Sequence, residues 1–156
     1  HIENSVHPPF NGEQMYLWES IPLTGAKKVF IMLGLNDVGL YGVDTTVQNF
    51  GKLINKIKAG VPDAKFYILS TTYMLKGKIG KLSTDRLREL NIALIDFCAN
   101  NGYEFINIAD ALTDADGNLK PEYCSDPNAL RIHHTYSAYE IRTALMKGFA
   151  ASKLAG

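Results

Sequence analysis

The chain has 156 residues, 46% of them hydrophobic and 10% aromatic, which is enough to bury one sizeable core and predicts a single domain. Sixteen basic residues balance sixteen acidic ones, and no run of like charge exceeds the Lys27-Lys28 pair, which argues against a nucleic-acid partner. No apolar run approaches the roughly 20 residues of a membrane span. Cys98 and Cys124 are too few for a disulfide framework and lack the spacing of a metal site, and we expect Cys98 to be a small buried hydrophobe.

The sequence opens with HIENSVHPPF rather than with Met, and we expect a processed or truncated chain. This opening lacks the basic segment and hydrophobic stretch of a signal peptide. The compartment stays open, with secretion and a bacterial cell envelope among the alternatives. Residues 1–26 are expected to form a loop and one helix that contains Met15, Leu17 and Trp18.

Two units of strand and helix come next in the chain. Residues 27–34 (KKVFIMLG) form a continuous apolar run that ends in glycine, as in a strand buried on both faces of a parallel sheet. Asp44 is expected to cap a helix over residues 45–59, which ends before Gly60 and Pro62. Its predicted apolar face consists of Val47, Phe50, Ile54 and Ile57.

The pattern then repeats. Residues 65–70 (KFYILS) predict a second strand, and Ser83 or Thr84 opens a helix that ends at Asn101-Gly102. The apolar stripe of that helix consists of Leu87, Leu90, Leu94 and Phe97. A third strand over residues 103–108 precedes an irregular stretch to about residue 135. A last helix is expected to turn Ala138, Ile141 and Leu145 inward.

This alternation predicts an α/β fold with three layers, in which a parallel sheet lies between helices and ligands bind at the carboxyl ends of the strands. The chemistry is therefore expected after residues 34, 70 and 108. The strand over residues 27–34 is the most apolar and is expected at the centre of the sheet. Because no strand precedes it, we expect either a missing amino-terminal segment or another chain, through self-association, to cover its free edge.

The sequence Gly34-Leu35-Asn36-Asp37 comes directly after the first strand. Asn36 can donate its amide to a ligand there, and Gly34 permits a close backbone approach. The alternative is that Asn36 and Asp37 only form a turn and cap the next element of the chain.

GLND after an apolar strand resembles the third sequence block of the SGNH (GDSL-type) serine esterases, which have a flavodoxin-like fold. The resemblance covers residues ~25–150. It implies that Asn36 donates to the oxyanion, that Gly34 and Asp37 belong to the same substrate and oxyanion site, and that Asp37 mainly shapes the turn.

The family's fourth block, Asp-x-x-His, should lie just before the last helix, where His133 and His134 stand. In the family a tyrosine often follows the histidine by six residues, and Tyr139 gives that register to His133. An Asp-x-x-His block would need an acid at Leu130. The nearest upstream acid is Asp126, which we predict to orient His133 despite the longer spacing.

The chain contains no Gly-Asp-Ser. By the resemblance, the nucleophilic serine and the strand before it are missing from the amino terminus, and the oxyanion glycine with them, since Gly12 has no strand before it. Cys124 as a nucleophile for His133 and a calcium loop at residues 114–118 are both disfavoured. Other loop aromatic residues could line a cleft or act as packing lids: Tyr41, Tyr73 and Tyr123.

The sequence therefore predicts a carboxylic-ester hydrolase of the SGNH type. We expect it to act on a small acyl or acetyl ester, including an acylated carbohydrate, without a metal or organic cofactor. A catalytically inactive binding or assembly module is the alternative. A flavodoxin-like nucleotide or phosphate binder ranks last, because no glycine-rich loop comes after the first strand.

Overall fold

The computed structural model describes residues 12–153. Its elements in chain order are α1 (Leu17–Leu23), β1 (Lys28–Ile31), α2 (Leu35–Tyr41), α3 (Val43–Gly60), β2 (Lys65–Leu69), β3 (Lys78–Ile79), β4 (Leu82–Ser83), α4 (Thr84–Asn101), β5 (Glu104–Ile106), the 3-10 turns η2 (Asp110–Leu112) and η3 (Pro121–Tyr123), and α5 (Tyr136–Ser152). The predicted alternation of strands and helices is confirmed.

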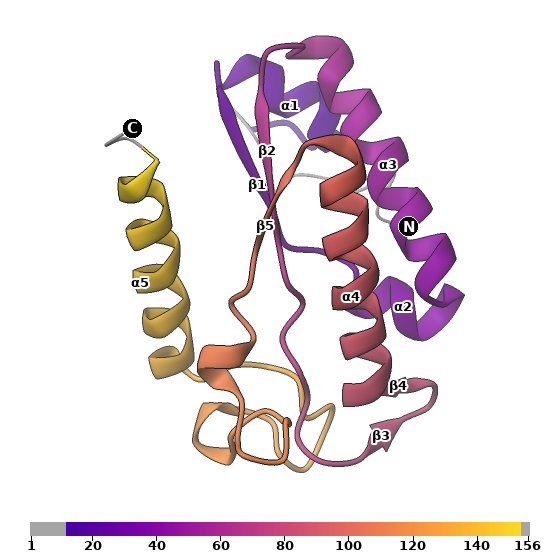
Figure 1. The fold of residues 1–156 in the computed structure, drawn as a ribbon, viewed down its shortest axis with the longest axis vertical. Coiled ribbons are helices and arrows are strands. Elements are labelled where there is room, and N and C mark those ends of the chain that lie inside the picture. Colours follow the sequence, from indigo (N-terminus) through magenta and orange to yellow (C-terminus); the bar gives the residue numbers. More distant parts are fainter. Residues whose placement is uncertain (1–11, 154–156) are drawn as a thin grey trace.

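A parallel sheet with the order β1-β2-β5 forms the middle layer. Helices α1, α3 and α4 lie on one face of this sheet and α5 lies on the other (Figure 1). This is the predicted three-layer α/β arrangement. A small antiparallel hairpin of β3 and β4 precedes α4.

Hydrophobic cores fill both spaces between the layers. The larger core joins the sheet to α3 and α4, and its buried side chains include Val29, Ile31, Phe50, Leu53, Ile54, Ile57, Ile68, Leu87, Leu90 and Leu94. The core on the other face joins Tyr67, Leu69 and Ile106 to Met146 and Phe149 of α5. The predicted stripes of α3 and α4 are confirmed, and Cys98 is buried as expected.

Within residues 12–153 the first strand lies at one edge of the sheet, with the free edge that the sequence predicts, and its expected place at the centre of a larger sheet stays a prediction. Strand β2 has a neighbour on each side, whereas β1 lies at the edge of the sheet and ends at Ile31. The apolar run continues to Leu33 because residues beyond the ladder still pack against the two cores.

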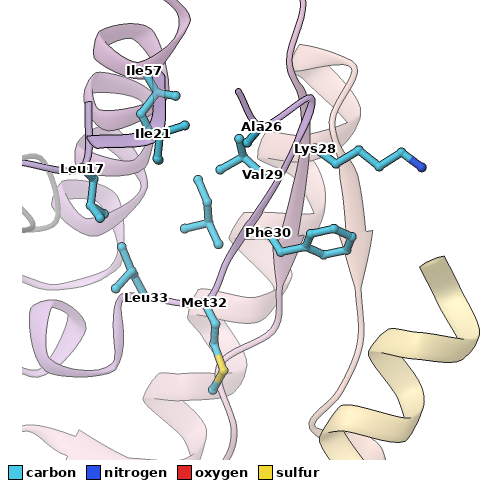
Figure 2. Close-up of a pocket in the computed structure, with 10 residues that line it drawn as sticks. Leu17, Ile21, Ala26, Lys28, Val29, Phe30, Met32, Leu33 and Ile57 are labelled. Atoms are coloured by element: carbon cyan, nitrogen blue, oxygen red, sulfur yellow. The ribbon is translucent and has the colours of Figure 1, made fainter. Parts of the chain in front are cut away.

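The free edge of β1 borders an apolar groove with a volume of about 350 Å³. Leu17 and Ile21 of α1 line its far side, and residues from both faces of β1 line the near side. In Figure 2, Lys28 and Phe30 point away from α1 and α3, whereas Val29 points toward them. Among residues 12–153, no strand pairs with this edge of β1, and apolar side chains line the groove beside it.

Three helix predictions can be compared with the structure. Gly42 is the N-cap of α3 and Asp44 lies in the first turn, so the predicted cap is wrong, although a carboxylate there still complements the helix dipole. The end prediction for α4 is confirmed, with Ser83 as N-cap and Gly102 in the left-handed conformation. Leu145 is 39% exposed rather than turned inward, because α5 contacts the sheet through a narrower stripe. None of the helices in residues 12–153 has the length and apolar character to span a bilayer.

Candidate active site

The candidate residues come from segments that follow the strands at their carboxyl ends. Helix α2 follows β1, and a long irregular segment follows β5 and leads into α5. Figure 1 shows α2, this segment and the start of α5 at the same end of the sheet. Parallel strands expose their ligand-binding loops at this end.

One carboxylate organises the segment before α5. Oδ1 of Asp126 accepts hydrogen bonds from the backbone N–H groups of Ile132 (3.1 Å) and His133 (3.0 Å) and from the Cys124 thiol (3.4 Å). Oδ2 accepts from the N–H of Leu130 (3.1 Å) and lies 2.8 Å from Nδ1 of His133. The longer spacing between acid and histidine is thus accommodated by a loop that wraps around the acid.

The backbone on either side of this loop forms a short antiparallel pairing. Ser125 donates to the carbonyl of His133 at 2.9 Å, and Thr135 donates to the carbonyl of Tyr123 at 3.0 Å. Cys124 and His134 face each other in this bridge. The pairing fixes the backbone that carries the candidate histidine.

Hydrogen bonding determines the charge of Asp126. Burial raises the pKa of its carboxyl, but the bonds from the His133 ring and backbone and from Cys124 outweigh this and lower the pKa to about 2. The carboxylate is therefore an anion near neutral pH and can only accept, so the proton of the His133 ring sits on Nδ1. Nε2 is left as the acceptor, on a side chain that is 60% exposed.

Asn36 lies in a short helix rather than in an open loop. It is the second residue of α2, and its side chain is exposed, with no hydrogen-bond partner within residues 12–153. Asp37 lies beside it in the first turn, half-buried. The Asn36 amide is therefore available to an external acceptor at the carboxyl end of β1.

Gly34 is needed for packing at the start of α2. Its φ of 103° lies in the left-handed region. A Cβ there would lie 3.2 Å from Leu90 and Thr46 and 3.3 Å from Phe50 side-chain atoms. Glycine thus lets the chain turn from β1 into α2 against α3 and α4. Its predicted contact with substrate stays a prediction.

A second polar cluster, which we did not predict, lies behind His133. Arg142 donates to Nδ1 of His134 at 3.0 Å and to Sδ of Met32 at 2.6 Å, and Tyr139 packs against both His134 and Arg142. Burial and the positive charges of Arg142 and His133 lower the pKa of His134 to about 4, so this ring is neutral at pH 7. The cluster joins the end of β1 to α5. The sign of this cluster in the sequence was the position of Arg142, which lies one helical turn after the buried Ala138 in α5.

Two serines within the described residues, Ser70 and Ser83, have structural roles. Ser70 is buried and its Oγ accepts from the N–H groups of Ile108 and Ala109, both at 3.0 Å. Ser83 caps α4. Over residues 12–153, the His133 ring bonds only to Asp126 and to no serine hydroxyl.

Residues 114–118, which were considered as a calcium loop, have a local hydrogen-bonding pattern. Oδ1 of Asp114 accepts from the backbone of Asp116 and Asn118, which closes a plain turn. The described part of the chain holds no cluster of three or more side chains suited to a metal ion. Among the aromatic candidates, Tyr41 is exposed at the end of α2, whereas the rings of Tyr73 and Tyr123 are covered by Arg88 and Lys120.

The sequence profile of the GDSL-like lipase/acylhydrolase family matches residues 10–141. The chain belongs to this family. The match includes Asn36, Asp126 and His133, and it supports an esterase-type hydrolase. None of the curated proteins matches the chain in sequence.

Solved structures share the GDSL fold. A protein from Bacteroides fragilis described as an acylhydrolase superposes with a TM-score of 0.72 and 19% identity over 87% of this chain and 66% of its own. A GDSL-like lipase from Bacteroides thetaiotaomicron gives 0.71 and 22%, over 86% and 67%. A protein from Streptococcus pneumoniae described as a platelet activating factor gives 0.70 and 23%, over 79% and 59%. The chain therefore spans from 59% to 67% of these proteins' lengths.

Proposed function

We propose that the protein is a carboxylic-ester hydrolase in which His133 is the general base, Asp126 orients it and Asn36 binds the oxyanion. The observation that carries the proposal is the 2.8 Å contact between Asp126 Oδ2 and His133 Nδ1, which leaves Nε2 as the acceptor of a side chain that is 60% exposed. Because residues 1–156 contain no Gly-Asp-Ser, we propose that the serine lies in a segment outside them, and that these residues form one part of a single GDSL domain.

The proposed reaction has two steps, acylation and deacylation, and the same three groups act in both. Nε2 of His133 takes the serine proton as the serine oxygen attacks the ester carbonyl carbon, and Asp126 stabilises the imidazolium. The Asn36 amide donates to the oxyanion, which returns to a carbonyl as the alcohol leaves with the proton from His133. Water then attacks the carbonyl carbon of the acyl-enzyme and gives a proton to Nε2 of His133. His133 returns this proton to the serine oxygen as the carboxylic acid leaves. No step calls for a metal or an organic cofactor.

The substrate class is inferred from the same groups. The Asn36 amide can donate to an ester carbonyl oxygen, and His133 can take the proton of the attacking hydroxyl, so we propose a small acyl or acetyl ester, including one on a carbohydrate. Gly34 and Asp37 would shape the oxyanion side of this site through the start of α2.

The test uses the protein produced from the complete reading frame that contains this chain, assayed with p-nitrophenyl acetate. We expect His133→Ala to abolish hydrolysis and Asn36→Ala to lower kcat about 10²-fold to 10³-fold, as for other side-chain oxyanion donors. Asn101→Ala is the matched control, because this exposed asparagine bonds only to its own helix at the far end of α4. Equal activity in His133→Ala and the unmodified protein would reject the proposal.

A catalytically inactive binding or assembly module is the second candidate. The absence of Gly-Asp-Ser from residues 1–156 favours it, together with the structural roles of Ser70 and Ser83. A complete reading frame without that motif, and no turnover of nitrophenyl acetate, would favour the module over the enzyme.

A further inference from the structure

Cys124 lies on the buried side of the Asp126 carboxylate. It is 7% exposed and packs in a small cluster with Leu112, Leu119 and Ala138 at the start of α5. Its backbone pairs with His134, and its Sγ lies 3.4 Å from Oδ1 of Asp126. The thiol therefore connects the carboxylate to the core beneath it.

The direction of this hydrogen bond is set by the chemistry of the two groups. A carboxylate can only accept, so the thiol must donate. Burial and the nearby Asp126 carboxylate raise the pKa of Cys124, which keeps the thiol protonated and able to donate. A buried, protonated thiol whose proton is engaged by a carboxylate is also a poor nucleophile.

Within residues 12–153 the thiol is the only side-chain donor to Oδ1, since the other two donors are backbone N–H groups of Ile132 and His133. The N–H of Ile132 belongs to the loop, and the N–H of His133 belongs to the end of the loop that pairs with Ser125. Cys124 belongs to the same pairing and also to the buried cluster beneath it. It therefore ties the carboxylate to a rigid part of the protein.

We propose that Cys124 is a positioning residue that fixes the rotamer of Asp126, so that Oδ2 faces Nδ1 of His133. This role deepens the proposed function and rests on it for its catalytic meaning. The geometry itself can be measured without any turnover.

The first experiment follows the Asp126 carboxyl by ¹³C NMR during a pH titration of the purified protein. We expect Cys124→Ala to raise the titration midpoint of Asp126 toward that of an ordinary aspartate. Cys124→Ser keeps a donor, so we expect the midpoint in that variant to stay close to that of the unmodified protein. Cys98→Ala is the matched control, because Cys98 is the other buried cysteine and lies on α4. An unchanged midpoint in Cys124→Ala, or an equal rise in Cys98→Ala, would overturn the proposal.

A second measurement covers the case in which Cys124→Ala does not fold. The chain has two cysteines, so the Cys98→Ala protein retains one thiol, and its Raman S–H band reports on Cys124 alone. We expect the low frequency of a donating thiol, which rises when Asp126→Ala removes the acceptor. A band at the frequency of a free thiol in the presence of Asp126 would also overturn the proposal.

Kinetics of the complete protein separate this inference from the proposed function. We expect Cys124→Ala to lower kcat about threefold to tenfold with KM unchanged, the effect of one net hydrogen bond, and Cys124→Ser to restore it. Equal activity in Cys124→Ala and in the unmodified enzyme would reject the positioning role and leave the esterase proposal unaffected. No turnover in any variant, together with the expected change in the Asp126 titration midpoint, would reject the esterase proposal and leave the positioning role unaffected.

Discussion

Nδ1 of His133 lies 2.8 Å from Oδ2 of Asp126, although the two residues are seven positions apart in the chain. The same carboxylate accepts three backbone N–H groups, so it orients the ring and also folds the loop that presents it. Changes at Asp126 should therefore affect stability and the candidate site together.

The first prediction concerns acid stability. The folded-state pKa of Asp126, about 2, lies below the ordinary value of an aspartate, so the ionised form stabilises the fold above the unfolded-state pKa. That stabilisation is lost as pH falls from ~4 toward ~2. We expect Asp126→Asn to lower the Tm near neutral pH and to flatten its pH dependence in this window, measured by calorimetry. Asp85→Asn, in an exposed ion pair with Arg88, is the control and should change Tm little. A Tm profile for Asp126→Asn parallel to that of the unmodified protein would contradict this.

The second prediction concerns the turn into α2. Gly34→Ala places a Cβ at positive φ against Leu90, Thr46 and Phe50, and we expect the free energy of unfolding to fall by about 1–3 kcal/mol. Gly148→Ala is the control, because a Cβ in this part of α5 meets nothing within 4 Å and alanine favours the helix by about 0.5–1 kcal/mol. Urea denaturation measures both, and a Gly34→Ala protein as stable as the original would show that the turn tolerates a side chain.

The third prediction concerns Arg142, which meets two neutral acceptors, His134 and Met32, and no acid within residues 12–153. Nε of Arg142 and Nε2 of His134 are buried without hydrogen-bond partners. We expect Arg142→Met and His134→Leu each to lower stability by about 1–3 kcal/mol, because each leaves a buried polar partner unsatisfied. The double variant should lose less than the sum, which a double-mutant cycle measures. Strict additivity would mean that the two side chains do not stabilise one another.

The fourth prediction concerns the open edge of β1. The other edge strand, β5, carries charged side chains, because Glu104 forms an ion pair with Lys153 at 2.6 Å. Strand β1 instead lies beside the apolar groove, and charged residues on an edge strand disfavour pairing with another chain. We expect the isolated 156-residue chain either to self-associate through β1 or to lose amide protection there before β5 does. Light scattering over a range of concentrations and hydrogen exchange measure the two effects. A monomer with fully protected β1 amides would refute the prediction.

Most of the fold could be predicted because its signals are local. Buried runs such as KKVFIM and helix stripes such as Leu87, Leu90 and Leu94 are recognised by periodicity, and Gly102 marks a helix end through its conformation. The free edge of β1 could be predicted because no strand precedes it in the chain, whereas composition reports burial on the two faces and not which segment covers that edge.

The candidate site was predictable only in part. Asn36, His133 and Asp126 were found by resemblance, and the spacing of the acid gave no geometric reason to pair it with His133. That reason is the wrapping of residues 126–133 around one carboxylate, a nonlocal feature of backbone hydrogen bonding. The Arg142 cluster was missed because it joins α5 to Met32, which comes from a distant part of the sequence.

The loop that closes on Asp126 also bears on how such sites can vary. Its ends are held by the pairing of residues 123–125 with 133–135, and its interior is anchored by N–H groups that point at one acid. The position of the imidazole is thus fixed by this pairing and by the shared carboxylate rather than by the number of residues between Asp126 and His133. A strict Asp-x-x-His spacing would not include this contact.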